Sequence, residues 1–184
     1  MCLGASVFLT VCVCVCAHTH IIGTPTVVKK ICKEPLEQML AACRDAGNQV
    51  VIISAFREHS TQIYLYNRKV NYFLNQGLDA ATARKEAGKI VAMPGTSEHE
   101  LGLAVDLVDS SYTELNEAQE NTDTQKWLME HCWEYGFILR YPSSKSDATG
   151  IIYEPWHYRY VGKEVAQELK ETGLCLEEYL GQLY

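Results

Sequence analysis

Several kinds of sequence feature are scarce or missing in this chain of 184 residues. It has no run of basic residues and a formal net charge of −7, so it does not offer the clustered Lys and Arg that a nucleic-acid backbone requires. Its eight cysteines include no C-x-x-C pair, which argues against a zinc knuckle or a thioredoxin-type motif. It also has no internal repeat and no interdomain linker. We therefore expect one main globular domain and no nucleic-acid partner.

The first 28 residues contain no Asp, Glu, Lys or Arg. Residues 3–17 are almost all apolar, which fits the hydrophobic region of a signal peptide, although the basic residue that usually precedes it is missing. The run is short for a transmembrane helix. We predict that residues 1–27 are a Cys-rich leader or membrane anchor and that residues 28–184 form the domain. The alternatives are an atypical or misassigned N-terminus and a metal site in the Cys-x-Cys and His-x-His alternation.

Helices and strands follow one another without a βαβ repeat, which predicts an α+β fold. Pro35 suits the first turn of the first expected helix. The expected helices cover residues 34–46, 57–76, 79–91, 123–135, 163–172 and 176–183, and the expected strands cover 49–56, 103–108, 137–141 and 156–161. Four cysteines lie in the body of the chain, and we expect them to be buried, with one disulfide as the alternative: Cys32, Cys43, Cys132 and Cys175.

His99 and Asp106 lie seven residues apart in a stretch rich in polar side chains. On one continuous helix that separation is about 10 Å along the axis, and on one continuous strand it points the two side chains to opposite faces. They can converge only where the chain bends, and Gly102 permits a bend. We therefore predict a turn or short helix carrying His99, followed by a strand over residues 103–108. A buried carboxylate on an apolar strand needs a partner, and a metal ion would be one.

A second group of candidate residues is Glu154-x-x-His157. The proline between them disfavours a helical conformation at Glu154, so we expect an extended segment and a strand over 156–161. His157 would then join His99 and Asp106 from a neighbouring strand. Two histidines and one carboxylate leave the fourth position of a tetrahedral zinc ion open for water, as in catalytic sites. Zinc lowers the pKa of that water to about 7, and Glu154 is placed to accept its proton.

Each of these residues has a simpler interpretation when it is taken alone. Asp106 and Glu154 could be surface or capping carboxylates. A single histidine beside aromatic residues is more often packed and hydrogen-bonded than a ligand, and we expect this of His18, His20, His59 and His131. Strict alternation along 156–161 would place Trp156, Tyr158 and Tyr160 on the face opposite His157.

Four linked motifs carry a family resemblance. They are Ser97-x-His99-x-x-Gly102-x-Ala104-x-Asp106, Glu154-x-Trp156-His157, Ser54-Ala55-Phe56-Arg57-x-x-x-x-Gln62, and Phe137-Ile138-Leu139-Arg140-Tyr141-Pro142 with Thr149-Gly150-Ile151. In this order, from about residue 28 to the C-terminus, they resemble the VanY-type D-alanyl-D-alanine carboxypeptidases. The same zinc-peptidase group includes VanX-type dipeptidases, L,D-carboxypeptidases and the hedgehog signalling domain. Ala55 departs from the family pattern, which usually has Gly there.

The resemblance implies a small, mostly antiparallel central sheet that carries a zinc site and is packed with helices. His99, Asp106 and His157 would bind Zn²⁺, and Glu154 would be the general base. Arg57 would stabilise the oxyanion and the carboxylate end of the substrate, where positive charge is needed. Three further residues would bind the peptide: Gln62, Ser97 and Tyr141.

The expected function is zinc-dependent hydrolysis of the C-terminal D-Ala-D-Ala bond of peptidoglycan stem peptides by a monomer. The alternatives within the enzyme class are L,D-carboxypeptidase and peptidoglycan endopeptidase action. A non-catalytic zinc-containing binding domain, as hedgehog-like members imply, is the alternative from another class, but Glu154 and Arg57 beside a full ligand set favour an enzyme. We expect an extracytoplasmic protein, in the bacterial cell envelope or secreted, with membrane anchoring through residues 1–27 and a cytoplasmic location as further options.

Overall fold

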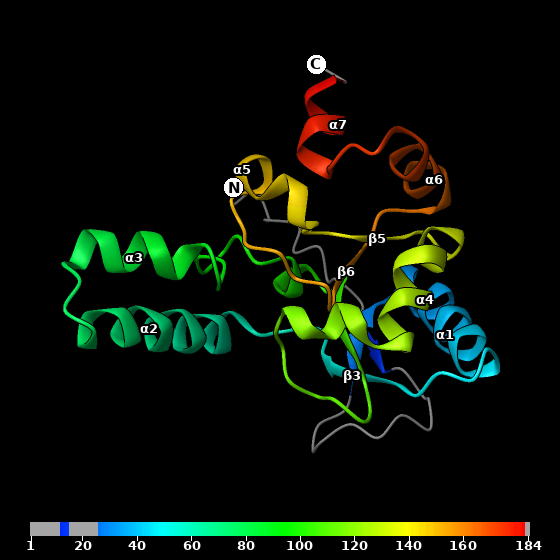
Figure 1. The fold of residues 1–184 in the computed structure, drawn as a ribbon, viewed down its shortest axis with the longest axis horizontal. Coiled ribbons are helices and arrows are strands. Elements are labelled where there is room, and N and C mark those ends of the chain that lie inside the picture. Colours follow the sequence, from blue (N-terminus) through cyan, green and yellow to red (C-terminus); the bar gives the residue numbers. More distant parts are fainter. Residues whose placement is uncertain (1–11, 15–25, 183–184) are drawn as a thin grey trace, which may run out of the picture.

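The computed structural model describes residues 12–14 and 26–182, which form an α+β fold around a four-stranded central sheet (Figure 1). The strands are antiparallel and lie in the order β3-β4-β6-β5, which confirms the predicted fold class. They are β3 (Val50–Ser54), β4 (Ala104–Asp109), β6 (His157–Tyr160) and β5 (Phe137–Leu139). Neighbouring strands therefore come from distant parts of the sequence.

Helices surround the sheet. Figure 1 shows α2 and α3 as a hairpin that projects from the body of the domain, with α1 and α4 on the other side. The α-helices are α1 (Lys30–Asp45), α2 (His59–Asn75), α3 (Ala80–Gly88), α4 (Asp123–His131), α5 (Ser146–Thr149), α6 (Lys163–Thr172) and α7 (Leu176–Gln182). Short 3-10 helices are η1 (Glu98–Leu101), η2 (Glu117–Asn121), η3 (Cys132–Tyr135) and η4 (Ser143–Lys145).

The main hydrophobic core lies between one face of the sheet and α1. Alternation along β4 sends Val105 and Leu107 into this core, where they meet Leu36 of α1 and the fully buried Tyr158 of β6. Burying each large apolar side chain contributes about 1.5–3 kcal/mol, and a slip of one residue would turn these side chains to the other face. The core therefore fixes the phase of β4 and directs Asp106 to the opposite face of the sheet.

A second, two-stranded sheet pairs β1 (Cys12–Cys14) with β2 (Val27–Lys29), and β2 runs directly into α1. Residues 1–11 and 15–25 lie outside the described residues, so the leader or anchor and the domain boundary at residue 27 stay predictions. His18 and His20 also lie outside them. Among the helices that the structure describes, none combines the length and the apolar character that crossing a membrane requires.

The four cysteines in the body of the chain are buried, as predicted. Cys43, Cys132 and Cys175 are free thiols, and the Cys32 thiol donates to the carbonyl oxygen of Lys29 at 3.1 Å. Burial raises the pKa of Cys43 and of Cys132 to about 12. These thiols therefore stay protonated and serve as small apolar side chains.

The first helix and one loop differ from the sequence expectation. α1 begins at Lys30, so Pro35 lies in its second turn and not in its first. The missing N–H of Pro35 leaves the carbonyl of Ile31 without a helical partner, and Ile31 is exposed, so water can replace that bond. Residues 142–150, where no helix or strand is expected, contain η4 and α5, which are too short to show a helical period in the sequence.

Candidate active site

Strand pairing brings polar side chains from three strands into one row. In the register of the sheet, Asp106 of β4 lies opposite His157 of β6 on one side and opposite Ser54 of β3 on the other. An irregularity between Ile52 and Ser54 shifts the phase of β3 at this point. Directly opposed residues have Cβ atoms about 4.5–5.5 Å apart. Antiparallel pairing alone therefore places Asp106 beside His157.

His99 reaches this row through a bend at Gly102. The 3-10 helix η1 ends at Gly102, whose φ of 67° lies in the left-handed region that favours glycine. The backbone N–H of Lys29 donates to the Gly102 carbonyl at 2.8 Å and ties the bend to β2. The bend predicted from the spacing is confirmed, and it brings His99 Nε2 to 3.3 Å from Asp106 Oδ2.

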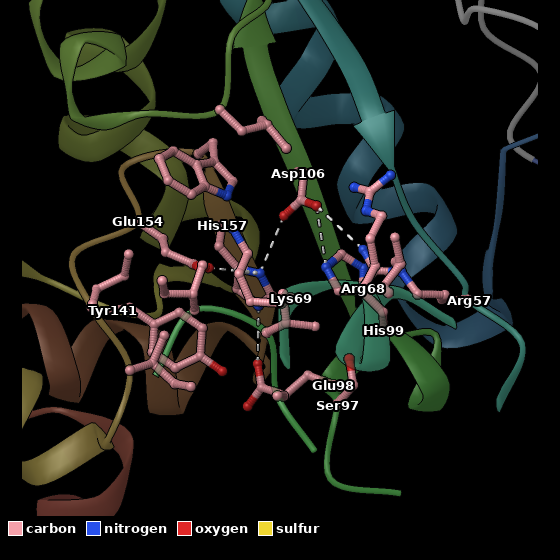
Figure 2. Close-up of a pocket in the computed structure, with 18 of the residues that line it drawn as sticks. Arg57, Arg68, Lys69, Ser97, Glu98, His99, Asp106, Tyr141, Glu154 and His157 are labelled. Atoms are coloured by element: carbon pink, nitrogen blue, oxygen red, sulfur yellow. Dashed lines mark hydrogen bonds and ion pairs between the residues drawn. The ribbon is translucent and has the colours of Figure 1, made fainter. Parts of the chain in front are cut away.

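His99, Asp106 and His157 form a buried group that can hold a metal ion (Figure 2). One ligand atom from each side chain lies within 4.8 Å of the others, and each residue is at most 5% exposed. Within the described residues Asp106 Oδ1 has no hydrogen-bond partner, although His157 Nδ1 is 3.2 Å away. A buried carboxylate oxygen left without a hydrogen bond fits a bound cation, and two imidazoles with one carboxylate are a donor set that suits zinc.

Outer partners orient both imidazole rings. His99 Nδ1 is 2.7 Å from the Ala55 carbonyl oxygen, which leaves Nε2 to face Asp106. His157 Nε2 is 3.4 Å from Glu98 Oε2, which leaves Nδ1 to face Asp106. Such partners fix the tautomer and the direction of the nitrogen lone pair in metal sites. The lone pairs of His99 Nε2 and His157 Nδ1 are therefore directed at the same point.

The centre of the group requires positive charge. Burial opposes ionisation of Asp106, but the neighbouring His99 and His157 hold its pKa well below its usual range. Burial also opposes the charged form of His157, yet the adjacent carboxylates of Asp106 and Glu98 raise its pKa to about 9. Burial dominates at His99 and lowers its pKa. A metal cation between these side chains would satisfy the same requirement.

Glu154 is a second carboxylate in the site, in a different environment. It lies just before β6, is 8% exposed, and places Oε2 at 3.7 Å from His157 Nδ1. Burial raises the pKa of Glu154 to about 8. Asp106 and Glu154 thus have pKa values displaced in opposite directions, which is how acid–base sites separate a charged carboxylate from one that exchanges protons.

Arg57 lies on the other side of the group and is held by fixed partners. Its terminal nitrogens donate to Gln62 Oε1 at 2.8 Å and to Ser54 Oγ at 2.9 Å, and one of them lies 3.8 Å from Asp106 Oδ2. Gln62 in turn is fully buried and donates to the Ala92 carbonyl at 2.7 Å. A guanidinium has five N–H donors, so donors remain for a substrate oxygen.

The group lies in a cleft of about 630 Å³ that Arg57, Glu154, Ser97 and Tyr141 also line. The ring of Tyr141 is 4.9 Å from the ring of His157. Gln62 does not line this cleft, because its amide faces Arg57 and the backbone. The structure therefore brings together the predicted ligands, base and arginine. Peptide binding by Ser97, Tyr141 and Gln62 stays a prediction, and Gln62 lies behind Arg57.

Trp156 differs from the sequence expectation. Strand β6 begins at His157, so alternation applies from His157 onward and does not include Trp156. Tyr158 is buried in the core and Tyr160 packs against it, as expected, whereas Trp156 lines the cleft beside His157. The turn before the strand turns the indole to the site and gives the cleft a large apolar wall.

Sequence reasoning assigned no role to Glu98, which supports the site from behind. Glu98 Oε1 accepts from Arg140 Nε at 2.8 Å and lies 2.7 Å from Arg159, while Oε2 faces His157. Burial works against the charged form of Glu98, but His157 and the two arginines bring its pKa down to about 2. The available signal was an acidic residue directly before His99, an arginine in one motif (Arg140) and another two residues after His157 (Arg159), without a spacing that would pair them.

A buried His/Asp/His group beside a buried glutamate with a raised pKa is typical of metallopeptidases. The sequence profile of VanY, D-alanyl-D-alanine carboxypeptidase, matches residues 25–163, and the chain belongs to this family. It is 42% identical over 146 residues to the D-alanyl-D-alanine carboxypeptidase of Enterococcus faecalis, covering 79% of this chain and 52% of that protein. It is 37% identical over 153 residues to the putative carboxypeptidase YodJ of Bacillus subtilis, covering 83% and 53%. The chain thus spans about half the length of these curated relatives.

Solved structures agree with this assignment. VanYB in complex with D-alanine-D-alanine has a TM-score of 0.78 and 38% identity, over 85% of this chain and 83% of that one. A mutant of the vancomycin resistance D,D-pentapeptidase VanY in complex with Zn(II) has a TM-score of 0.76 and 36% identity, over 86% of each chain. The LD-carboxypeptidase LdcB has a TM-score of 0.74 and 36% identity, over 84% of this chain and 69% of that one.

Proposed function

We propose that this chain is a zinc-dependent D-alanyl-D-alanine carboxypeptidase acting on peptidoglycan stem peptides. The observation that carries the proposal is one cleft in which Glu154 and Arg57 flank the group formed by His99, Asp106 and His157. The family membership supports it, as do the related structures with Zn(II) and with D-alanine-D-alanine.

The metal site would be formed by His99 Nε2, His157 Nδ1 and the Asp106 carboxylate. Bound there, zinc would lower the pKa of a water molecule to about 7 and polarise the scissile carbonyl. The protein's own part is to hold the three ligands rigidly. The sheet register sets the positions of Asp106 and His157, and the bend at Gly102 sets that of His99.

Glu154 would move the proton during hydrolysis. Its carboxylate takes the proton of the attacking water and then delivers it to the amine nitrogen of the departing D-alanine. A pKa of about 8 suits both steps near neutral pH, because Glu154 exchanges its proton readily in that range. Glu154 is only 8% exposed, which limits the contact of this carboxylate with bulk water.

Arg57 would bind the oxygen on which negative charge develops. Ser54 and Gln62 hold the guanidinium in position before substrate arrives, so little reorganisation is needed when the charge forms. Ser97 and Tyr141 line the cleft and would hydrogen-bond the peptide. Burial raises the pKa of Tyr141, so its hydroxyl stays protonated and can donate.

L,D-carboxypeptidase activity is the second candidate function, favoured by the similarity to LdcB. The experiment that separates the two compares D-alanine release from a pentapeptide ending in D-Ala-D-Ala with release from the tetrapeptide one residue shorter. We expect faster release from the pentapeptide. Faster release from the tetrapeptide would assign the L,D function, and no release from either would favour a binding domain or an endopeptidase.

We further propose that the protein works as a monomer on peptidoglycan stem peptides or their precursors outside the cytoplasmic membrane. The absence of charge in residues 1–28 supports export or anchoring, and the cell-wall substrate is consistent with it. Fractionation of cells that express the full chain, followed by size measurement of the purified protein, tests both statements.

A further inference from the structure

Helix α2 has two faces with different tasks. On one face Tyr66, Val70 and Phe73 pack against α3 and hold the hairpin together. Four other residues of the same helix line the cleft that contains the metal-binding group: Leu65, Arg68, Lys69 and Tyr72. Their spacing of i, i+3, i+4 and i+7 defines one continuous helix face. This side of the cleft wall is therefore one continuous face of α2. Its two central residues are the basic Arg68 and Lys69.

Arg68 and Lys69 have no acidic partner in the part of the chain that the structure describes. No ion pair joins either residue to a carboxylate there, and their contacts are with aromatic rings: Arg68 with Tyr64 at 5.8 Å and Lys69 with Tyr72 at 5.4 Å. Two adjacent like charges repel each other. In a chain with a net charge of −7, this is a local excess of positive charge that faces the cleft. An anionic group in the cleft would neutralise it.

The position of the pair limits which part of a substrate could reach it. Gln62 is the residue that holds Arg57. Lys69 lies seven residues after Gln62 on α2, a separation of about 10 Å along the helix axis. An extended peptide covers about 3.3–3.6 Å per residue, so this distance corresponds to about three residues. A carboxypeptidase has a single residue on the leaving side of the scissile bond. We therefore assign the group that meets this pair to the acyl side of the substrate.

We propose that Arg68 and Lys69 form a subsite for a carboxylate on the acyl side of the substrate, two or three residues before the scissile bond (Figure 2). The inference rests on the proposed carboxypeptidase function and adds a charge requirement to its substrate. The cleft lining also includes the apolar residues Leu115, Ile151 and Ile152, which could contact the uncharged part of the peptide. The pair thus acts in substrate selection, outside the reacting atoms.

Two peptides test the subsite. Both end in D-Ala-D-Ala, and they differ three residues before the cut, where one has a free carboxylate and the other has the corresponding amide. We expect kcat/KM to be about twofold to fivefold higher for the carboxylate peptide, through a lower KM, as is typical of exposed charge pairs. The preference should shrink as salt rises from about 0.05 M to about 0.5 M.

The hairpin offers a matched control. The double variant Arg68→Gln with Lys69→Gln should bring the ratio of the two kcat/KM values close to one. Arg84→Gln with Lys85→Gln removes the same charge from an adjacent Arg-Lys pair on α3, which is exposed and lies outside the cleft lining. This control should keep the wild-type ratio. If the ratio of the two kcat/KM values fell close to one in both double variants, the overall positive charge of the hairpin, and not the subsite, would set the preference.

Equilibrium binding of the same peptides, measured by calorimetry, separates this inference from the proposed function. If the carboxylate peptide binds more tightly, and this difference requires Arg68 and Lys69, the subsite is supported even when no bond is cleaved. Absence of cleavage would then count against the proposed function alone. Equal binding of both peptides to the wild-type protein, or a preference that survives in the Arg68/Lys69 double variant, would overturn the subsite.

Discussion

His157 shows how neighbouring residues assign two different roles to one side chain. Its Nδ1 faces Asp106 and Glu154, whereas its Nε2 faces Glu98, which comes from η1. Sequence spacing identifies His157 as a candidate ligand, but it does not reveal which nitrogen binds. That choice depends on Glu98, which is 59 positions away in the sequence. Residue type and motif therefore predict the ligand set, and packing decides its geometry.

Replacing Glu154 by Gln tests the proton-transfer role at the residue scale. Glu154→Gln keeps the size of the side chain but removes the proton acceptor, so we expect kcat for D-alanine release to fall about a hundredfold to ten-thousandfold. Zinc content should stay at the wild-type level, because the three ligands are unchanged. Metal content and turnover are measured on the same preparation. A variant with wild-type turnover would remove Glu154 from the mechanism.

Gly102 is the element-scale feature on which the metal site depends. The substitution Gly102→Ala forces an alanine into the left-handed region, at a cost of about 1–2 kcal/mol in the free energy of unfolding. Because the bend positions His99, we also expect weaker zinc binding. Gly173→Ala is the matched control, since Gly173 has a φ of 68° at the end of α6 with open space around it.

Urea unfolding and competition with a metal chelator measure the two effects of these glycine substitutions separately. Gly102→Ala should lose at least as much stability as Gly173→Ala, because Gly102 is buried and Gly173 is exposed, and only Gly102→Ala should lose zinc affinity. Equal zinc affinity in the two variants would show that the bend does not control the position of His99.

Ion pairs of unequal strength join helix α7 to Arg140, which follows β5, and to Lys145 of η4. Arg140 is buried between Glu98 and Glu177, whereas Lys145 pairs with Glu178 near the surface. Breaking a buried pair leaves a desolvated charge, so we expect Arg140→Met to lower the free energy of unfolding by about 3 kcal/mol. Lys145→Met should cost at most about 1 kcal/mol. Urea unfolding of both full-length variants decides the order, and equal losses would contradict it.

Elements with strong periodicity were predictable, and those defined by tertiary contacts were not. The strand expected over residues 103–108 and the helix expected to begin at residue 79 match β4 and the start of α3, which Asp79 caps. The start of α1 does not, because β2 runs directly into the helix and no capping side chain marks the junction. Trp156 was misplaced for a similar reason, since a turn interrupts the alternation that its neighbours follow.

At the scale of the whole molecule, the cleft is formed by elements whose relative positions cannot be predicted from the sequence. The motifs predicted the ligands, the base and the arginine because each is a short local pattern. The projecting α2–α3 hairpin and its stripe of Arg68 and Lys69 were not predicted as part of the site (Figure 1). Their position depends on how the hairpin packs, which has no local signature in the sequence.

The proposed release of D-alanine depends on a bound metal ion, and this dependence is measured by titrating zinc back into the stripped protein. Protein that has been stripped with a chelator and dialysed should release no D-alanine from a pentapeptide ending in D-Ala-D-Ala. Activity should return in proportion to added zinc and level off at one ion per chain, as a single His99/Asp106/His157 site requires. Release of D-alanine by the stripped protein, or recovery that continues well beyond one ion per chain, would contradict the account.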